Sequence, residues 1–279
     1  MSVPTATLRG GDEMPLIGLG TWNLSGRAAT DAVKSALETG YTHLDTAEGY
    51  ENEDRVGEAI QGMDREELFL TSKVLPKHLD YESVIESAEA TLERLGTEYL
   101  DLYLIHWPNP AISVRETLAA MAELHDRGVV KNVGVSNFSP YQLSAAQHVS
   151  PVPIAVNQIE FHPYLQRPDW LRYTRETGVV LEAAAPLARG EVLTDPVVTE
   201  LAETYGKTPA QIVLRWAIER DVGVIPKSHS RSHIEENLAI TDWDLDPDDH
   251  DRLSAIERDE AVYDVRGRSW TDDTYGIAE

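Results

Sequence analysis

The first half of this chain places an acid, a phenol, an ammonium and an imidazole where they could share one reaction. Asp45 follows an apolar run, and Tyr50 lies five residues later, before a helical pattern that begins after Asn52. Lys73 follows the stretch LFLTS, and His106 follows YLDLYLI. A phenol near an ammonium and a carboxylate can transfer a proton, and an imidazole can hold or relay one. Taken one at a time, the same residues are equally compatible with loop capping, packing or an ordinary ion pair.

The expected electrostatics of this group depend on burial. Because Lys73 ends an apolar run, its amine is expected to lie partly out of water, where a neighbouring Asp45 would keep it charged. That charge is expected to lower the pKa of the Tyr50 phenol. His106 is expected to donate a hydrogen bond to a substrate oxygen or to relay the proton. Together the four residues predict proton transfer at a substrate oxygen.

A repeated pattern of apolar run, polar loop and helical stretch would position these residues. The expected strands cover 16–21, 41–46, 68–74, 99–106, 130–136, 154–160, 179–185 and 222–226. Helical patterns cover 28–39, 81–95, 114–127, 170–176 and 209–219, and Asp31 and Ser139 are predicted helix starts. Eight strands alternating with helices predict an α/β fold, a (β/α)8 TIM barrel, with residues 1–279 forming a single domain.

Both ends of the chain are expected to add to this barrel. Residues 5–8 and 14–19 predict an N-terminal β-hairpin, and residues 246–258 predict an extra C-terminal helix. The polar tail, 262–279, is expected to be a loop over one barrel end. The alternative architecture is an open, doubly wound sheet, which normally carries a glycine-rich phosphate turn after its first strand. Residues 18–23 read GLGTWN, so that fingerprint is incomplete.

In a TIM barrel the active site lies at the C-terminal ends of the strands, so the residues there are the candidates for chemistry. They are Thr21 and Trp22, Asp45, Lys73, His106 and Trp107, Ser136 and Asn137, Gln158 to His162, and Lys227 and Ser228. Burying so many polar groups is costly unless they meet one another, water or a ligand. The pattern therefore predicts one site assembled from most of the strands.

The composition argues against several classes of partner. Asp and Glu number 48 against 24 Lys and Arg, for a net charge of −24. Nucleic acid or an anionic membrane surface would require a basic face, so neither is expected as a partner. The chain has no cysteine, no apolar stretch of membrane-spanning length and no signal-peptide pattern, so a cytoplasmic location is expected. The acidity, with 6 lysines against 18 arginines, favours a halophilic protein; an acidic mesophile protein is the alternative.

Several segments, taken in order and at their spacing, resemble the aldo-keto reductase family in its prokaryotic form. They are LDTAEGYENEDRVGEAI, TSKV, LIHWP, VGVSNF, VNQIEFHP and IPKS. The resemblance implies that Asp45, Tyr50, Lys73 and His106 are the catalytic residues. Tyr50 would protonate the carbonyl oxygen as hydride arrives from NAD(P)H, Asp45 and Lys73 would tune it, and His106 would orient the substrate.

The resemblance also implies a set of cofactor and substrate residues. Ser136, Asn137 and Gln158 match the positions that hold the nicotinamide carboxamide. Lys227 and Ser228 match the pair that reaches the phosphate on the adenosine ribose, and Glu236 and Asn237 match the adenine contacts. The expected cofactor-binding set is completed by Thr21, Pro186, Leu187, Ser230 and His233, and Trp22 and Trp107 match walls of the substrate pocket. His162 has no implied role and is expected to be structural.

Three positions depart from the family pattern. The aromatic residue on which the nicotinamide stacks is Ala184, and the serine beside it is Ala185. Losing that ring would remove about 1 kcal/mol of stacking unless a tryptophan or tyrosine from elsewhere fills the space. The arginine that clamps the ribose phosphate is His233, although Arg231 is near enough in sequence to substitute. NADP(H) is the expected cofactor, and use of NAD(H) stays open.

Three functions remain to be compared. The first is NADP(H)-dependent reduction of small aldehydes, ketones or sugar-type carbonyls by a monomer or weak homo-oligomer. The second is a cofactor-binding regulatory or sensing protein on the same scaffold with little turnover, which the missing ring at Ala184 favours. The third is a metal-dependent hydrolase using His106, His162 and Asp45. No close pair of histidines supports this third function, so no metal site is expected.

Overall fold

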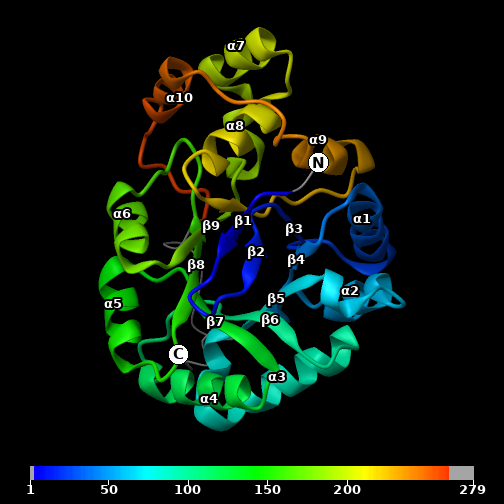
Figure 1. Cartoon of the computed structure of the whole chain (residues 1–279), viewed down its shortest axis with the longest axis vertical. Helices are drawn as coiled ribbons and strands as arrows, with labels where there is room; N and C mark the ends of the chain where they lie inside the picture. The colour runs from blue at the N-terminus through cyan, green and yellow to red at the C-terminus, as the bar shows by residue number, and fades with distance from the viewer. Residues whose placement is uncertain (1–2, 264–279) are drawn as a thin grey trace, which may run out of the picture.

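Eight parallel strands, hydrogen-bonded in sequence order, form the central sheet of the computed structural model, which describes residues 3–263 (Figure 1). They are β3 (Gly18–Gly20), β4 (His43–Asp45), β5 (Phe69–Val74), β6 (Leu100–Ile105), β7 (Val130–Ser136), β8 (Ile154–Glu160), β9 (Val180–Ala184) and β10 (Gly223–Val224). The Val224 amide donates to the Leu16 carbonyl at 2.7 Å, and Gly20 donates to Pro226 at 3.2 Å. These bonds join the last strand to the first, so the predicted (β/α)8 barrel is confirmed.

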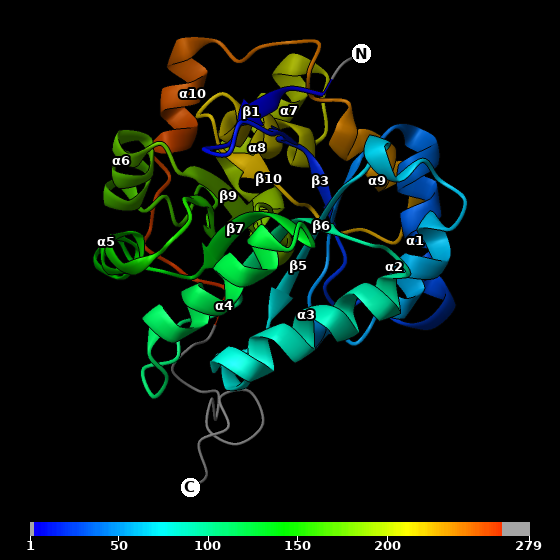
Figure 2. The ribbon, with the colours of Figure 1, turned by 60° about the horizontal axis from the view of Figure 1, so that its bottom comes forward.

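Helices surround the sheet and cover its outer face (Figures 1 and 2). They are α1 (Gly26–Thr39), α2 (Glu53–Ile60), α3 (Tyr81–Leu95), α4 (Val114–Asp126), α5 (Pro140–Val149), α6 (Pro168–Thr177), α7 (Pro196–Tyr205), α8 (Pro209–Ile218), α9 (Arg231–Leu238) and α10 (Pro247–Ser254). Several of them present an apolar stripe inward; in α1, for example, Ala29, Val33 and Ala36 are buried. The strands, covered on one side by helices and filled on the other by barrel side chains, are almost wholly buried, which explains their near-continuous apolar sequences.

The helix boundaries show which local signals were reliable. Ser139 begins α5 with a capping box in which it and Gln142 satisfy each other's backbone amides, as predicted. The predicted start at Asp31 is wrong, because α1 begins at Gly26 after the extended residue Ser25, five residues before the aspartate. The C-terminal helix exists but is shorter than predicted, since α10 ends at Ser254.

The two ends of the barrel are closed differently. Strands β1 (Thr5–Thr7) and β2 (Glu13–Pro15) form the predicted antiparallel hairpin, which is held to the N-terminal end of the sheet. Asn132 at the start of β7 donates to Asp12 at 2.7 Å, and Arg9 donates to the Thr177 carbonyl at 3.2 Å. The hairpin therefore covers one end and leaves the C-terminal strand ends for a site. Of the tail predicted to cover a barrel end, residues 264–279 lie outside the described part of the chain.

Candidate active site

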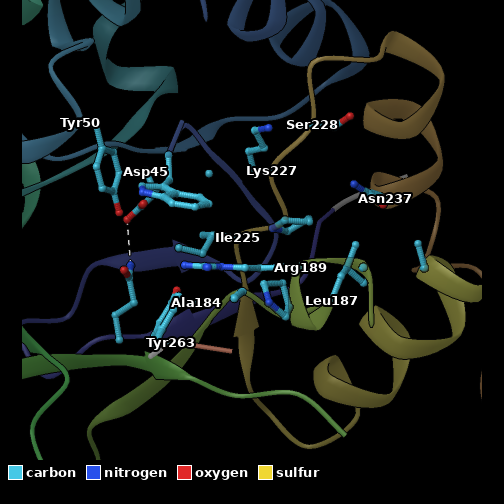
Figure 3. Close-up of a pocket in the computed structure, with 18 of the residues that line it drawn as sticks. Asp45, Tyr50, Ala184, Leu187, Arg189, Ile225, Lys227, Ser228, Asn237 and Tyr263 are labelled. Atoms are coloured by element: carbon cyan, nitrogen blue, oxygen red, sulfur yellow. Dashed lines mark hydrogen bonds between the residues drawn. The ribbon is translucent and has the colours of Figure 1, made fainter. Parts of the chain in front are cut away.

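A cavity of about 780 Å³ opens at the C-terminal ends of the strands (Figure 3). Most residues predicted for the site line it: Trp22, Asp45, Tyr50, His106, Trp107, Ser136, Asn137, Gln158, Pro186, Leu187, Lys227, Ser228, His233, Glu236 and Asn237. Three predicted residues, Thr21, Lys73 and Ser230, are not on its surface. Sequence segments separated by up to two hundred residues thus converge on one cavity, as the barrel topology requires.

The predicted proton-transfer group is assembled beneath one end of the cavity. The Lys73 amine donates to the Asp45 carboxylate at 2.7 Å, to the Thr46 carbonyl at 2.8 Å and to the Tyr50 hydroxyl at 3.3 Å. Lys73 and Asp45 are almost entirely shielded from solvent, with 0% and 1% of their side chains exposed. Tyr50 comes from the short 3-10 helix η1 (Glu48–Tyr50), which carries the phenol from the end of β4 over to Lys73 on β5. The Lys73 ammonium is therefore held within hydrogen-bonding distance of the Tyr50 hydroxyl.

Burial controls the protonation of this group. Burial raises the pKa of Tyr50 well above its ordinary value, and the charges of Asp45 and Glu182 raise it further. The expectation of a lowered pKa for Tyr50 is therefore wrong, because burial and the two carboxylates raise it. The phenol stays protonated, which is the form that an acid requires. Burial and the charge of Lys73 lower the pKa of His106 to about 3, so its imidazole is neutral.

His106 faces the phenol from the end of β6. Its ring packs edge-on against the Tyr50 ring, with centroids 5.6 Å apart and planes at 77°. Its Nδ1 atom is buried and has no hydrogen-bond partner within residues 3–263. A neutral imidazole in this position can hold a substrate oxygen near the Tyr50 hydroxyl without adding charge to the site.

Amide and hydroxyl groups line the wall beside the phenol. Gln158 donates to the second Asp45 oxygen at 2.8 Å. Ser136 donates to the Gln158 carbonyl at 2.8 Å, and the Asn137 amide donates to the His106 carbonyl at 3.0 Å. Asn137 adopts a left-handed backbone with φ of 64°, which turns it over the end of β7. These contacts fix groups that can bind an amide-bearing ring.

The opposite end of the cavity lies on the loop after β10 and on α9. Lys227 is exposed and forms no ion pair among the described residues, although the chain contains 48 acidic residues. Ser228 is buried, and its hydroxyl oxygen accepts a hydrogen bond of 3.0 Å from the backbone amide of Ser230. This bond shapes the turn that leads into α9. His233, Glu236 and Asn237 line the same end. An unpaired ammonium with a neighbouring hydroxyl suits a phosphate group.

Two predicted cofactor residues, Thr21 and Ser230, do not line the cavity, and neither does Arg231. Thr21 donates to the Asp45 carbonyl at 3.0 Å and so holds the end of β4. The Ser230 hydroxyl pairs with that of Ser232 at 2.9 Å and does not line the cavity. Arg231, considered as a substitute for the missing arginine, is bound to Glu38 at 2.5 Å and to Glu235 at 3.0 Å. These two ion pairs hold Arg231 outside the cavity lining, with 54% of its side chain exposed.

Among the cavity residues that the sequence analysis missed, Arg189 and Tyr263 carry the largest polar and aromatic side chains. The Arg189 guanidinium lies over the Trp22 ring at 4.7 Å and over the Tyr263 ring at 5.2 Å from the centroids. Both line the cavity with Ala184, the position that lacks the expected aromatic ring (Figure 3). Left-handed φ values at Ala185, Ala188 and Arg189 mark this loop as strained. No pattern of spacing pointed to Arg189.

Tyr263 reaches the cavity because the chain after α10 is held by Glu160. The amides of Val262 and Tyr263 donate to the Glu160 carboxylate at 2.5 and 3.1 Å, and His162 contacts it at 2.9 Å. Burial alone would raise the pKa of Glu160, but these hydrogen bonds outweigh burial and lower it. The predicted structural role of His162 agrees with this contact. Glu160 thus brings an aromatic ring from the far end of the chain to Trp107, 6.4 Å away.

Comparison with known proteins identifies the class of this barrel. Residues 16–258 match the aldo/keto reductase family, so the chain belongs to that family. It is 41% identical to a glyoxal reductase of Bacillus subtilis over 92% of this chain and 94% of that protein. It is 39% identical to a putative methylglyoxal reductase of Salmonella typhi, over 92% and 95% of the two chains. An aldo-keto reductase of Bombyx mori in complex with NADP has a TM-score of 0.90 at 30% identity, covering 99% of each chain.

Family and site together define an NAD(P)H-dependent carbonyl reductase. The cavity carries amide and hydroxyl groups at the end near Tyr50 and an unpaired Lys227 at the other, and this donor set fits a nicotinamide dinucleotide. No group of three or more His, Asp or Glu residues suited to a metal ion occurs within residues 3–263. Over the same residues, no helix is long and apolar enough to cross a membrane.

Proposed function

We propose that this protein reduces the carbonyl group of small aldehydes, ketones or sugar-type substrates with NADP(H), and that Tyr50 is the general acid. The observation that carries the proposal is the position of the Tyr50 hydroxyl, 3.3 Å from a fully buried Lys73 amine that is itself paired with Asp45. The bound dinucleotide would supply the hydride. Proton delivery to the developing alkoxide is then the task of the protein.

Each residue of the site has a definite task in this proposal. The Tyr50 hydroxyl donates its proton to the substrate oxygen, and the Lys73 ammonium stabilises the phenolate that remains. Asp45 keeps Lys73 charged and oriented at 2.7 Å. His106, neutral at working pH, holds the carbonyl oxygen beside Tyr50. Trp22 and Trp107 form the apolar walls that exclude water.

Ser136, Asn137 and Gln158 would hold the nicotinamide carboxamide, and Lys227 and Ser228 the phosphate on the adenosine ribose. Thr21, Pro186, Leu187, Glu236 and Asn237 complete the groove, with Thr21 acting through the backbone of Asp45. Since Arg231 is held by two carboxylates and His233 replaces the usual arginine, the preference for NADP(H) should be moderate, and NAD(H) should also serve.

The names of two relatives, a glyoxal reductase and a putative methylglyoxal reductase, support small dicarbonyl aldehydes as substrates. Purified protein should oxidise NADPH when glyoxal or methylglyoxal is added. The Tyr50→Phe variant should lose about 10²–10⁴-fold in turnover, the usual contribution of a general acid, while binding NADPH as before. Tyr141→Phe is the matched control, because Tyr141 is 84% exposed on α5. Undiminished turnover in Tyr50→Phe would remove the phenol from its role.

The regulatory alternative predicts a different result from the same assay. A sensing protein would bind NADPH tightly and show no turnover with any carbonyl compound, in the wild-type chain as in Tyr50→Phe. The buried proton-transfer group argues against this alternative, because a pure sensor would not need a phenol held 3.3 Å from an ammonium.

We also propose a cytoplasmic enzyme adapted to high salt. The support is the net charge of −24, which high salt would screen. If this is correct, the thermal midpoint measured in 2 M KCl, a concentration chosen to be roughly ten times physiological ionic strength, will exceed that in dilute buffer by several degrees. An unchanged or lower midpoint would instead indicate an acidic mesophile protein.

A further inference from the structure

Glu182 on β9 is a buried carboxyl group to which the proposed reaction assigns no task. Only 1% of the residue is exposed, and it does not line the cavity. It lies inside the barrel beneath Gln158, on the strand between β8 and β10. Its Oε2 atom accepts a hydrogen bond of 2.6 Å from the Gln158 amide, while its Oε1 atom has no hydrogen-bond partner within residues 3–263. A buried carboxyl is costly to keep, so its contact with Gln158 needs a reason.

The contacts of Gln158 determine which way its amide faces. Its nitrogen lies 2.8 Å from Asp45 and 2.6 Å from Glu182, so each of its two hydrogens points at a carboxyl oxygen. The reversed orientation would place the amide oxygen against the Asp45 carboxylate, which has no hydrogen to donate when ionised. Both donors of Gln158 are therefore used inside the barrel. Its oxygen remains as an acceptor for whatever lies beside it in the cavity.

The same contacts connect Glu182 to the proton-transfer group. The chain of hydrogen bonds runs from Glu182 through Gln158 and Asp45 to Lys73, which contacts Tyr50. Loss of the hydrogen bond between Glu182 and Gln158 would therefore free the Gln158 amide to rotate, and it would weaken the hydrogen bond that Gln158 donates to Asp45.

The charged groups around Glu182 set its own state and its effect on Tyr50. Burial raises the pKa of Glu182, and Asp45 adds to this rise against the opposing influence of His43 and Lys73. His43 comes closest on the unpartnered side, with its Nε2 atom 3.8 Å from Oε1 and 3.1 Å from the Thr71 hydroxyl. When ionised, Glu182 raises the pKa of Tyr50. The carboxyl thus acts on the phenol by charge as well as through hydrogen bonds.

We propose that Glu182 is a positioning residue of the hydride-transfer site. It fixes the Gln158 amide with its oxygen toward the nicotinamide carboxamide, and as a second carboxyl group beside Asp45 it adds negative charge to the hydrogen-bonded chain that ends at Tyr50. This inference rests on the proposed function, because it assumes that the nicotinamide binds beside Gln158. It adds a residue that neither touches the cofactor nor faces the substrate.

Two variants separate the geometric effect from the effect of charge. Glu182→Gln keeps an oxygen for the Gln158 amide and removes the charge, whereas Glu182→Leu removes both. The dissociation constant of NADPH, measured by fluorescence titration, should rise about tenfold in Glu182→Leu, because one amide hydrogen loses its acceptor. In Glu182→Gln it should stay within about twofold of wild type, so the conservative variant rescues binding.

The charge effect appears in the reverse reaction, where Tyr50 must accept a proton. The rate of alcohol oxidation rises with pH as the phenol ionises, and this rise should move to lower pH in Glu182→Gln. A group that only filled space would change the thermal midpoint and leave the pH profile in place. A profile that coincides with that of wild type would overturn the electrostatic part of the proposal.

Glu53 on α2 provides the matched control. It is also 1% exposed, but its carboxylate accepts hydrogen bonds from Ser72 and Arg94 and makes none with Gln158 among the described residues. Glu53→Gln should alter stability without changing the NADPH dissociation constant. If Glu182→Leu folds and binds NADPH as tightly as wild type, the positioning role is wrong. That result differs from failure of the proposed function, in which the wild-type protein itself would not turn over.

Discussion

The charged residues at the two ends of the cofactor cavity differ in burial and in pairing. At the catalytic end, Asp45 and Lys73 project from strands, are almost wholly buried and are bonded to each other at 2.7 Å. At the phosphate end, Lys227 stands on an exposed loop without an ion pair among the described residues, and Arg231 is bound to carboxylates on the outer surface. A buried charge must be paired and cannot move, whereas an exposed one is screened by water and easily exchanged. The catalytic end should therefore tolerate little change, and the phosphate end should be adjustable.

The sharpest test of this contrast removes Lys73. Lys73→Met leaves the Asp45 carboxylate buried without its partner, which should cost about 3–5 kcal/mol of unfolding free energy. Turnover should fall about 10²–10⁴-fold, because the phenolate formed by Tyr50 loses its stabilising charge. Denaturant unfolding and steady-state kinetics measure the two effects.

Lys131 offers an exposed charge for comparison. It lies 3.4 Å from Asp101, is 41% exposed, and leaves Asp101 still bound to Arg65 when removed. Lys131→Met should cost less than about 1 kcal/mol and leave turnover unchanged. Equal losses in the two lysine variants would contradict the distinction between a buried and an exposed charge.

The phosphate end should respond to gain rather than loss of a charge. His233→Arg restores a guanidinium beside Lys227 and Ser228, and the ratio of kcat/KM for NADPH to that for NADH should rise about tenfold. Glu235→Gln, which loosens Arg231, should raise the ratio by a smaller factor of about three. Both effects should shrink with added salt. If the ratio of kcat/KM for NADPH to that for NADH is the same in His233→Arg as in wild type, the ribose phosphate binds elsewhere.

The residues at the catalytic end could be predicted from the sequence, whereas the contacts of several loop residues could not. Asp45, Lys73 and His106 end apolar strands, so the barrel topology alone brings them to one rim, and the sequence located all of them. Arg231 was considered as a phosphate ligand because it is near in sequence, yet Glu38, far away on α1, binds it instead. Tyr263 reaches the cavity through Glu160, a contact spanning about a hundred residues that no periodicity reveals. Strand ends are fixed by local pattern, and loop contacts by distant partners.

A further expected effect concerns the cavity wall, where Ala184 replaces an aromatic residue. If Tyr263 supplies the missing ring, Tyr263→Leu should weaken NADPH binding by about 0.5–1.5 kcal/mol, the value of one aromatic contact. Ala184→Tyr should recover that loss in the Tyr263→Leu background and give little gain alone, because Tyr263 already fills the space. Such non-additivity is expected only of residues that compete for one position. The NADPH binding free energies of the single and double variants can be measured by calorimetric titration. If the effects of the two substitutions are additive, Tyr263 only closes the cavity and does not stack on the nicotinamide.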